Sequence, residues 1–398
     1  MKTLTRTEYL NQLKSVNGTH DIKVITGVRR SGKSVLMHSY IEWIKRNVKN
    51  ANIIFVDFTS LKYEPLKEYH ALNNYVESNY IEHKMNYVFI DEVQMCPKFE
   101  LTINSLHSSG NYDIYITGSN AFLLSSDLAT LFTGRTFEIE VFPFSFKEYS
   151  EYRHIDDVQS AFDQYMKDGG MAGSYDYLNQ EDKYKYLNDV FTTLIVRDIR
   201  QKYSIKNTLL MERMIDFLMD NVSNLTTARK IAETLTCNKD LINHKTVGKY
   251  LEYLCNAFAF YKVRRYDIQG RKYLASSDKY YLSDHAFRYA RLGIKNLDQG
   301  RMLENVIAIE LMRRGYEIYA GVLYKKEIDF VAVKHSEKIY IQVSDDITSD
   351  ETFIREVSPL LKIKDAYPKI LISRTRHEEY QYEGVRIIDA ANWLLNLQ

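Results

Sequence analysis

The chain has 398 residues, which is more than one hydrophobic core usually supports, so two or three domains are expected. Its 53 Lys and Arg residues nearly balance its 52 Asp and Glu residues, which excludes a global charge that would by itself attract nucleic acid or an anionic membrane. Because no run of about twenty apolar residues occurs and the N-terminus has no apolar signal core, we expect no membrane anchor.

The three cysteines, Cys96, Cys237 and Cys255, lie far apart and form no C-x-x-C pair. This spacing argues against a zinc cluster and against a disulfide framework, and it is typical of a reducing compartment. We therefore expect buried, inert cysteines in a soluble protein of the cytoplasm.

The first third of the chain alternates short apolar runs with amphipathic ones. A helix is predicted at 7–15, a buried strand at 22–26 and a helix at 34–48. Further strands are predicted at 52–58, 87–90, 113–117 and 136–142, with helices at 66–82 and 99–108. This alternation predicts an α/β fold, a three-layer sandwich around a parallel sheet.

The loop after the first strand, Gly27-Val28-Arg29-Arg30-Ser31-Gly32-Lys33-Ser34, matches the pattern G-x-x-x-x-G-K-S. Its glycines let backbone N–H groups curl around phosphates, Lys33 would reach the β and γ oxygens, and the Ser34 hydroxyl would ligate Mg²⁺. The following helix adds the partial positive charge of its N-terminus. The pattern predicts a nucleoside triphosphate site made by Gly27, Arg30, Ser31, Gly32, Lys33 and Ser34.

A second motif, at 87–92, is an apolar strand that ends in Asp91 and Glu92. The carboxyl ends of strands are where ligands bind in open α/β sheets. We expect Asp91 to hold Mg²⁺ through water, and Glu92 to polarise a water for in-line attack on the γ-phosphate. Without the upstream loop, the alternative would be a strand that ends in two solvated acids.

Two further positions are candidates for catalysis. Asn120, or its neighbour Ser119, follows a strand and could orient the attacking water; the alternative is an Asn-capped turn before a helix at 121–131. Arg135 is the candidate cation for transition-state charge, in cis or in a neighbouring subunit, and its alternative is an ordinary surface arginine at a turn.

Residues 146–205 carry a helical pattern that includes Asp198 between Arg197 and Arg200. Following a nucleotide-binding domain, this segment is predicted to be a helical lid.

Residues 206–285 predict a winged helix, because three helices at 209–221, 228–235 and 245–257 precede a hairpin. This part contains the locally basic surface of the chain, which would bind double-stranded DNA. Its members are Lys245, Lys249, Lys262, Arg264, Arg265, Arg271 and Lys272. The alternatives are a protein-docking module and a solvated basic face.

Residues 286–398 have the layout of a PD-(D/E)XK nuclease: a helix with Glu304, a strand with Asp329, and a strand that ends in Gln342-x-Ser344. That chemistry needs an acid at 342 to hold Mg²⁺ and a lysine at 344 to activate water. Gln is a poorer Mg²⁺ ligand than a carboxylate, and neutral Ser cannot supply the lysine's charge. The pattern therefore predicts a nuclease-like α/β domain without cleavage.

Together these motifs resemble the bacterial and archaeal AAA-type P-loop ATPases that join an N-terminal P-loop domain to a C-terminal domain of unknown function. The resemblance spans nearly the whole chain. It rests on G-V-R-R-S-G-K-S at 27–34, F-I-D-E-V-Q at 89–94, T-G-S-N at 117–120, F-T-G-R at 132–135, F-P-F-S-F-K-E-Y at 142–149, L-E-N-V at 303–306 and E-I-D-F-V at 327–331. It implies an AAA-like core at 1–145, related to archaeal DNA-associated ATPases, and favours ATP over GTP.

We therefore predict an Mg²⁺-dependent ATPase whose nucleotide cycle changes the contacts of the winged helix and the nuclease-like domain with DNA. Two alternatives remain open: a nucleotide-gated adaptor that binds proteins and not DNA, and an active metal-dependent nuclease. An arginine supplied in trans would require a homo-oligomer.

Overall fold

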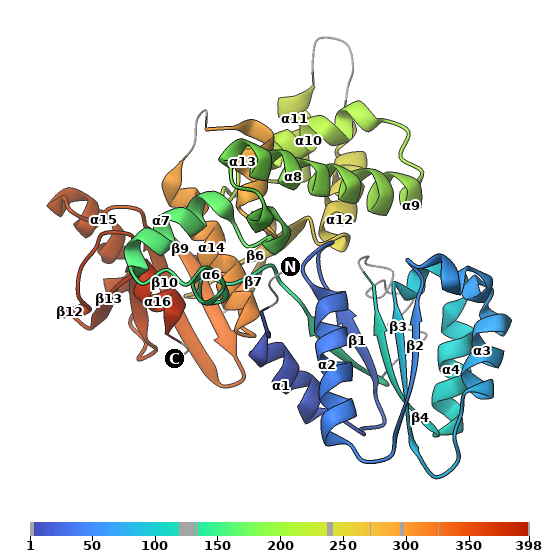
Figure 1. The fold of residues 1–398 in the computed structure, drawn as a ribbon. Coiled ribbons are helices and arrows are strands. Elements are labelled where there is room, and N and C mark those ends of the chain that lie inside the picture. The colour runs from blue at the N-terminus through green and yellow to red at the C-terminus, as the bar shows by residue number, and fades with distance from the viewer. Residues whose placement is uncertain are drawn as a thin grey trace. The chain divides into compact units, whose positions relative to one another are not determined.

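The computed structural model describes residues 4–118, 132, 134–236, 242–270, 272–294, 298–324 and 326–396, with the backbone alone at 197, 201 and 272–276. By their contacts the residues form two compact units, 1–142 with 256–258, and 143–255 with 259–398 (Figure 1). Within the described ranges, no helix has both the length and the apolar character needed to cross a bilayer. Each unit is described by itself below.

The first unit contains a five-stranded parallel sheet with the order β2-β3-β4-β1-β5. The strands are β1 (Ile22–Thr26), β2 (Ala51–Asp57), β3 (Met85–Asp91), β4 (Tyr112–Thr117) and β5 (Thr136–Glu140). The helices are α1 (Thr7–Ser15), α2 (Lys33–Asn47), α3 (Tyr69–Ser78) and α4 (Phe99–Ser109), with short 3-10 turns η1 (Leu61–Lys67) and η2 (Val93–Met95).

Both faces of this sheet are covered, because successive side chains of a strand point to opposite faces. In β3, Val88 and Ile90 pack against α3 and α4, whereas Tyr87 and Phe89 pack against α1 and α2. The predicted three-layer α/β sandwich with a parallel sheet is confirmed.

One helix of this unit differs from its prediction. The helix expected at 66–82 begins only at Tyr69, where the Glu68 carboxylate caps it by accepting a hydrogen bond from Ala71 N at 2.8 Å. Pro65 lies in the preceding 3-10 turn, and the helix ends at Ser78. The apolar residues beyond Ser78 suggested a longer helix than the backbone forms.

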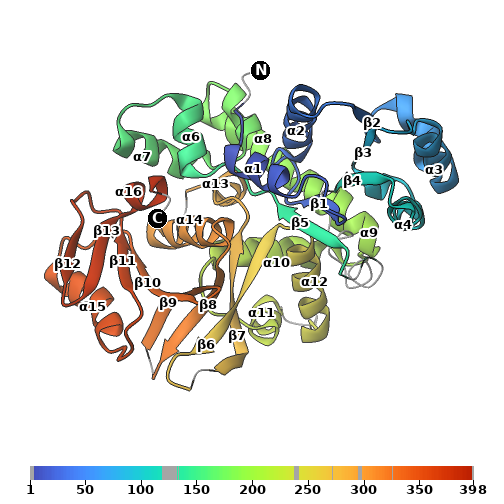
Figure 2. The same cartoon turned by 90° about the horizontal axis from the view of Figure 1, so that it is seen from below.

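The second unit contains an eight-stranded sheet with the order β12-β13-β11-β10-β9-β8-β6-β7 (Figure 2). Its strands are β6 (Phe260–Asp267), β7 (Lys272–Leu282), β8 (Glu317–Leu323), β9 (Lys326–Lys334), β10 (Glu337–Ser344), β11 (Lys369–Ser373), β12 (Tyr380–Tyr382) and β13 (Val385–Asp389). The predicted hairpin corresponds to β6 and β7, and the predicted strands with Asp329 and before Ser344 correspond to β9 and β10.

The predicted winged-helix hairpin is part of this larger sheet, because β6 also pairs in parallel with β8. Tyr266 lies opposite Gly321 in that pairing. A side chain at 321 would meet Ile268 and Ile328 at about 3.0 Å, so glycine permits the close approach of the two segments. Residues 206–285 and 286–398, which the sequence analysis separated, therefore share one sheet.

The helices of the second unit include those expected in residues 146–257. They are α6 (Phe146–Arg153), α7 (Val158–Asp168), α8 (Gln180–Thr193), the π-helical η5 (Leu194–Arg200), α9 (Gln201–Tyr203), α10 (Thr208–Asp220), α11 (Ala228–Leu235) and α12 (His244–Asn256). They are joined by α13 (Ala286–Leu292), α14 (Gln299–Arg313), α15 (Asp350–Leu361) and α16 (Ala390–Leu395). Within this unit α8 contacts α13, and α16 contacts α6 and α7.

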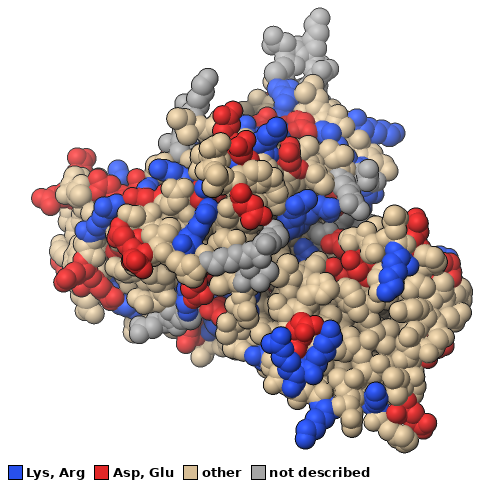
Figure 3. Space-filling model, in the orientation of Figure 1, with Lys and Arg blue, Asp and Glu red and all other residues tan. Residues whose placement is uncertain are grey.

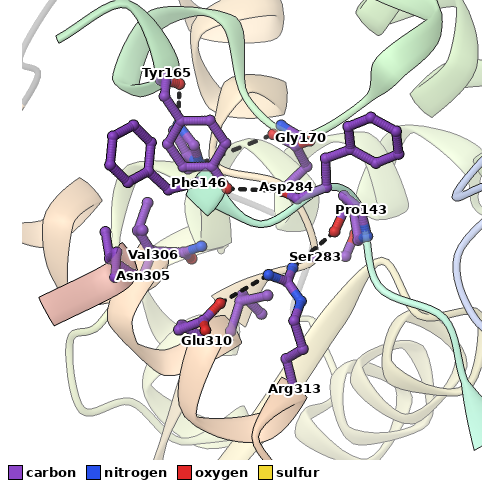
Figure 4. A pocket seen from close by; sticks show the side chains of 14 residues that line it. Pro143, Phe146, Tyr165, Gly170, Ser283, Asp284, Asn305, Val306, Glu310 and Arg313 are labelled. Carbon is purple, nitrogen blue, oxygen red and sulfur yellow. Dashed lines mark hydrogen bonds and ion pairs between the residues drawn. The ribbon is translucent and has the colours of Figure 1, made fainter. Parts of the chain in front are cut away.

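A small polar cavity of about 10 Å³ lies where the segment before α6 meets α14 (Figure 4). Arg313 donates one hydrogen bond to Pro143 O at 2.7 Å and another to Glu310 at 2.8 Å. Gly170 N donates to Asp284 at 2.8 Å, and burial raises the pKa of that carboxyl. The cavity has room for about one water, so it serves packing and not ligand binding.

Candidate nucleotide site

The backbone of the loop between β1 and α2 explains its glycines. Gly27 has φ +127° and Gly32 has φ +98°, both in the region that favours glycine. A Cβ at Gly27 would lie 2.3 Å from Val141 O, so no side chain fits there. Arg30 also has a positive φ, 64°. The loop therefore curls over the end of β1, as the G-x-x-x-x-G-K-S pattern requires.

Lys33 lies inside this curl. Its ammonium group donates hydrogen bonds to Gly27 O and Val28 O, both at 2.9 Å, and only 5% of the residue is exposed. These two carbonyls hold the positive charge at the mouth of the loop, beside the first turn of α2. A triphosphate bound by the loop would meet both the ammonium and the positive end of the helix dipole.

Asp91 and Ser34 meet at the carboxyl edge of the sheet. Asp91 ends β3 and is 4% exposed; its carboxylate accepts hydrogen bonds from the hydroxyls of Ser34 and Thr117. Burial raises the pKa of Asp91, and these two hydrogen bonds oppose the rise. A carboxylate beside a hydroxyl is a donor set that fits Mg²⁺.

Glu92 leaves the strand through a left-handed backbone conformation, with φ 54° and ψ 48°. A non-glycine residue there costs about 1 kcal/mol or more and persists only where neighbours enforce it. Glu92 N donates to the Thr117 hydroxyl at 3.0 Å, and Gln94 Nε2 donates to Glu92 Oε2 at 2.6 Å. The turn and these two bonds orient the carboxylate beside Asp91.

Two functional candidates were missed by sequence reasoning. Thr117 is fully buried at the end of β4 and bridges Asp91 and Glu92. Its position was visible in the sequence, as a hydroxyl residue at the carboxyl end of the strand next to β3. Arg6 is 5% exposed and donates to Ser31 O at 3.0 Å and to Phe142 O at 2.8 Å. No motif in the sequence marked Arg6, because an arginine before an amphipathic helix is common and its burial is seen only in the structure.

Arg6 is supported by its neighbour Tyr9. The guanidinium carbon lies 4.5 Å from the centre of the Tyr9 ring, and the Tyr9 hydroxyl accepts a hydrogen bond from Phe142 N at 3.2 Å. The N-terminal segment thus contacts the loop between β1 and α2, called the phosphate loop below, through Ser31 O. Ser31 itself is 4% exposed.

Arg135 is not brought together with Lys33. Its backbone oxygen accepts a hydrogen bond from Ile22 N at 2.8 Å, at the amino end of β1, whereas the phosphate loop follows the carboxyl end. Five strand residues separate the two ends by roughly 16 Å. This position argues against a role on a nucleotide in its own chain. A role in a neighbouring subunit and an ordinary surface arginine at a turn are the two remaining interpretations. Asn120, Ser119 and the helix expected at 121–131 lie outside the described residues.

A surface cavity lies beside Arg135, at the amino edge of the five-stranded sheet. The surface cavity there has a volume of about 310 Å³ and is lined by His20, Asp21, His107, Ser108, Gly134 and Arg135. The arginine is exposed, so it is accessible from outside the unit.

The predicted DNA-binding cations have different surroundings. Lys245 and Lys249 on α12 and Arg264 on β6 are exposed. Lys262 forms an ion pair with Asp278 at 2.9 Å, and both line a cavity of about 440 Å³ together with residues of α11 and α12.

The remaining three predicted DNA-binding cations are Arg265, Arg271 and Lys272. The Arg265 side chain donates to the Ser277 hydroxyl at 3.4 Å. Arg271 and the Lys272 side chain lie outside the described residues. In the view of Figure 3, Lys and Arg residues are interspersed with Asp and Glu residues.

The cysteines that the structure describes are Cys96 and Cys255. Burial raises the pKa of Cys96 to about 11 and that of Cys255 to about 12, which disfavours the thiolate form of each at neutral pH. Cys96 is buried, and Cys255 is partly exposed. Cys237 lies outside the described residues.

Family models and known proteins match this chain. Residues 19–150 match the family model of an AAA domain, and residues 159–298 match that of a domain of unknown function. An uncharacterized protein of Haemophilus influenzae is 38% identical over 398 residues, 98% of each chain. An uncharacterized protein of Methanocaldococcus jannaschii is 26% identical over 343 residues, 81% of this chain and 74% of that one.

Solved structures give more distant likenesses. The Aeropyrum pernix ORC1 protein in complex with DNA has a TM-score of 0.33 and 11% identity, covering 77% of this chain and 95% of that one. AMPPCP-bound DnaA from Aquifex aeolicus has a TM-score of 0.32 and 14% identity, covering 62% and 85%. We draw no functional conclusion from likenesses this weak. With its AAA domain at 19–150, the chain belongs to the same family of AAA-type P-loop proteins as the Haemophilus influenzae protein.

Proposed function

We propose that the protein is an Mg²⁺-dependent ATPase of the AAA type. The observation that carries the proposal is the meeting of Ser34, Asp91 and Glu92 at one edge of the sheet, beside the loop that holds Lys33. Membership of residues 19–150 in an AAA domain family supports ATP as the nucleotide.

In this mechanism the loop amides and the Lys33 ammonium bind the triphosphate. Ser34 and Asp91 would hold Mg²⁺, which supplies charge neutralisation at the β and γ oxygens. Glu92 accepts the proton of the water that attacks the γ-phosphate. Gln94 Nε2 donates a hydrogen bond to its carboxylate, and the hydrogen bond from Glu92 N to the Thr117 hydroxyl holds its backbone in place. Thr117 thus couples the metal ligand to the base.

The test is steady-state ATP hydrolysis with Mg²⁺, together with direct ATP binding. Lys33→Ala should abolish tight binding, whereas Glu92→Gln should retain binding and stop turnover. Glu82→Gln, an exposed glutamate of the same unit, is the matched control and should hydrolyse ATP normally. Turnover by Glu92→Gln at the unsubstituted rate would remove Glu92 from the mechanism.

We further propose that the cycle changes contacts of residues 206–398 with double-stranded DNA in the cytoplasm. The exposed Lys245, Lys249 and Arg264 support this partner. DNA should stimulate hydrolysis at low salt, and its affinity should fall with salt at a log–log slope near one per phosphate contact. An unchanged rate and a flat salt dependence would favour the nucleotide-gated protein adaptor.

A further inference from the structure

The second unit brings three carboxylates together on one face of its sheet. Glu304 comes from α14, and Glu327 and Asp329 come from β9. Glu304 is 9% exposed and Asp329 is 8% exposed. The nuclease-like layout requires two of these acids, Glu304 and Asp329, to lie near each other, since they would share a metal ion.

A lysine from another strand enters this group. Lys279, on β7, is 1% exposed, and its ammonium lies 2.8 Å from Glu304 Oε1, 2.5 Å from Glu327 Oε1 and 3.6 Å from Asp329 Oδ1. The Tyr281 hydroxyl, two residues along the same strand, donates to Glu304 Oε1 at 2.7 Å. Sequence reasoning missed this contact, because it assigned residues 206–285 to a different domain from Glu304, Glu327 and Asp329.

The side chains of Gln342 and Ser344, the other two positions of the nuclease pattern, form their hydrogen bonds with groups other than the side chains of Lys279 and the three acids. Gln342 accepts a weak hydrogen bond from Asp329 N at 3.4 Å and donates to Glu356 at 3.1 Å. Asp329 Oδ2 accepts from Val343 N at 2.8 Å. The Ser344 hydroxyl donates to Asp346 O at 2.9 Å. Neither 342 nor 344 thus adds an anionic oxygen or a cation to the group.

These residues do not fit a divalent ion. Oxygens that a metal would need already accept hydrogen bonds from Lys279, Tyr281 and Val343. In the part of the chain that the structure describes, no three His, Cys, Asp or Glu side chains are arranged to hold a metal ion. An entering ion would have to displace the ammonium and leave it buried without its partners, which is unfavourable.

We propose that Lys279 is the built-in cation of this acidic group. Its ammonium occupies the place that a metal would take in a nuclease, and it fastens β7 to β9 and α14. The C-terminal sheet therefore binds no divalent ion, and it cleaves no phosphodiester by metal-dependent chemistry. The proposal does not depend on ATP hydrolysis by the first unit.

The test is a Mn²⁺ titration of the full chain without nucleotide, in which electron paramagnetic resonance measures free Mn²⁺. Every sample carries Asp91→Asn, so that the phosphate-loop site does not contribute. The chain with Lys279 should bind no Mn²⁺ below about 1 mM, whereas Lys279→Ala should gain one ion per chain at least about tenfold more tightly. Asp329→Asn added to Lys279→Ala should remove that ion.

Lys262→Ala is the matched control. It removes another lysine of the same hairpin, but Lys262 pairs with Asp278, which is not one of the three acids that surround Lys279. It should gain no ion. A Mn²⁺ ion bound by the chain with Lys279 and lost on Asp329→Asn would overturn the proposal. So would a Lys279→Ala chain that melts cooperatively and gains no ion. If Lys279→Ala does not fold, Mn²⁺ binding is compared between chains that keep Lys279, with and without Asp329→Asn. Equal binding by the two supports the proposal, and a loss of binding on Asp329→Asn overturns it.

Discussion

Thr117→Val removes one hydroxyl from the nucleotide site while keeping the side-chain volume nearly constant. The hydroxyl donates to Asp91 and accepts from Glu92 N, and no part of Thr117 is exposed. A hydrogen bond to a charged group contributes about 1.5–3 kcal/mol, and a buried unpaired N–H costs about 1–3 kcal/mol. We expect the free energy of unfolding to fall by about 3 kcal/mol after partial relaxation.

The same change should impair the chemistry. The hydrogen bond from Thr117 lowers the pKa of Asp91, so its loss raises that pKa further and weakens the Mg²⁺ ligand. We expect Mg²⁺–ATP affinity to fall by about tenfold, equivalent to about 1.4 kcal/mol, and turnover to fall as well because Glu92 loses its anchor. Denaturant unfolding, ATP titration and steady-state hydrolysis measure the three effects.

Thr102→Val is the matched control for this prediction. Thr102 lies on α4, is 2% exposed and donates a single hydrogen bond to Tyr69 O at 2.7 Å, away from the site. It should lose about 1 kcal/mol of stability and keep full hydrolysis. A Thr117→Val chain that binds and hydrolyses ATP as the unsubstituted chain does would refute the assigned bridge between Asp91 and Glu92.

Three further outcomes are expected. Arg6→Met should raise the KM for ATP by about tenfold, because the Ser31 and Phe142 carbonyls lose the donor that holds the phosphate loop. An unchanged KM in a stable variant would contradict this. If Arg135 acts in a neighbouring subunit, Arg135→Ala and Lys33→Ala chains should each be inactive alone and should regain ATP hydrolysis when they are mixed. A mixture that stays inactive would argue against this role. Burial, followed by the charge of Glu304, raises the pKa of Asp329 from 3.8 to about 8. The folded chain thus retains a proton that the unfolded chain has lost, so the free energy of unfolding should fall as pH rises towards 8, by at most about 1.4 kcal/mol per pH unit. Denaturant unfolding at several pH values should show a flatter dependence in Asp329→Asn, and identical slopes would show that Asp329 does not titrate in this range.

Much of the first unit could be predicted from the sequence because its signals are local. Gly27 and Gly32 mark backbone conformations, and the apolar strand before Asp91 fixes its edge of the sheet. The parallel arrangement then brings the ends of neighbouring strands together. Arg6 and Lys279 could not be predicted in the same way. Arg6 bridges Ser31 and the distant Phe142, and the partners of Lys279 lie in a separately assigned domain.

The second unit shows a different limit. The strands β6, β8, β9 and β10 have clear apolar patterns, yet pattern alone does not tell which strand edges will pair. Gly321 opposite Tyr266 permits β6 and β8 to join, and this only becomes evident in three dimensions. Arg135 directly precedes β5, so it lies at the amino edge of the parallel sheet, away from the phosphate loop.

The pairing of β6 with β8 has a consequence for how the chain can be divided. A fragment that ends at residue 285 would expose the edge of β6 and strip Lys279 of the acids on α14 and β9. A fragment that begins at 286 would leave those acids without their counter-charge and the edge of β8 unpaired. We therefore expect that neither piece folds independently, that the two halves of the sheet are inherited together, and that gene fusions that keep only one of them yield insoluble protein.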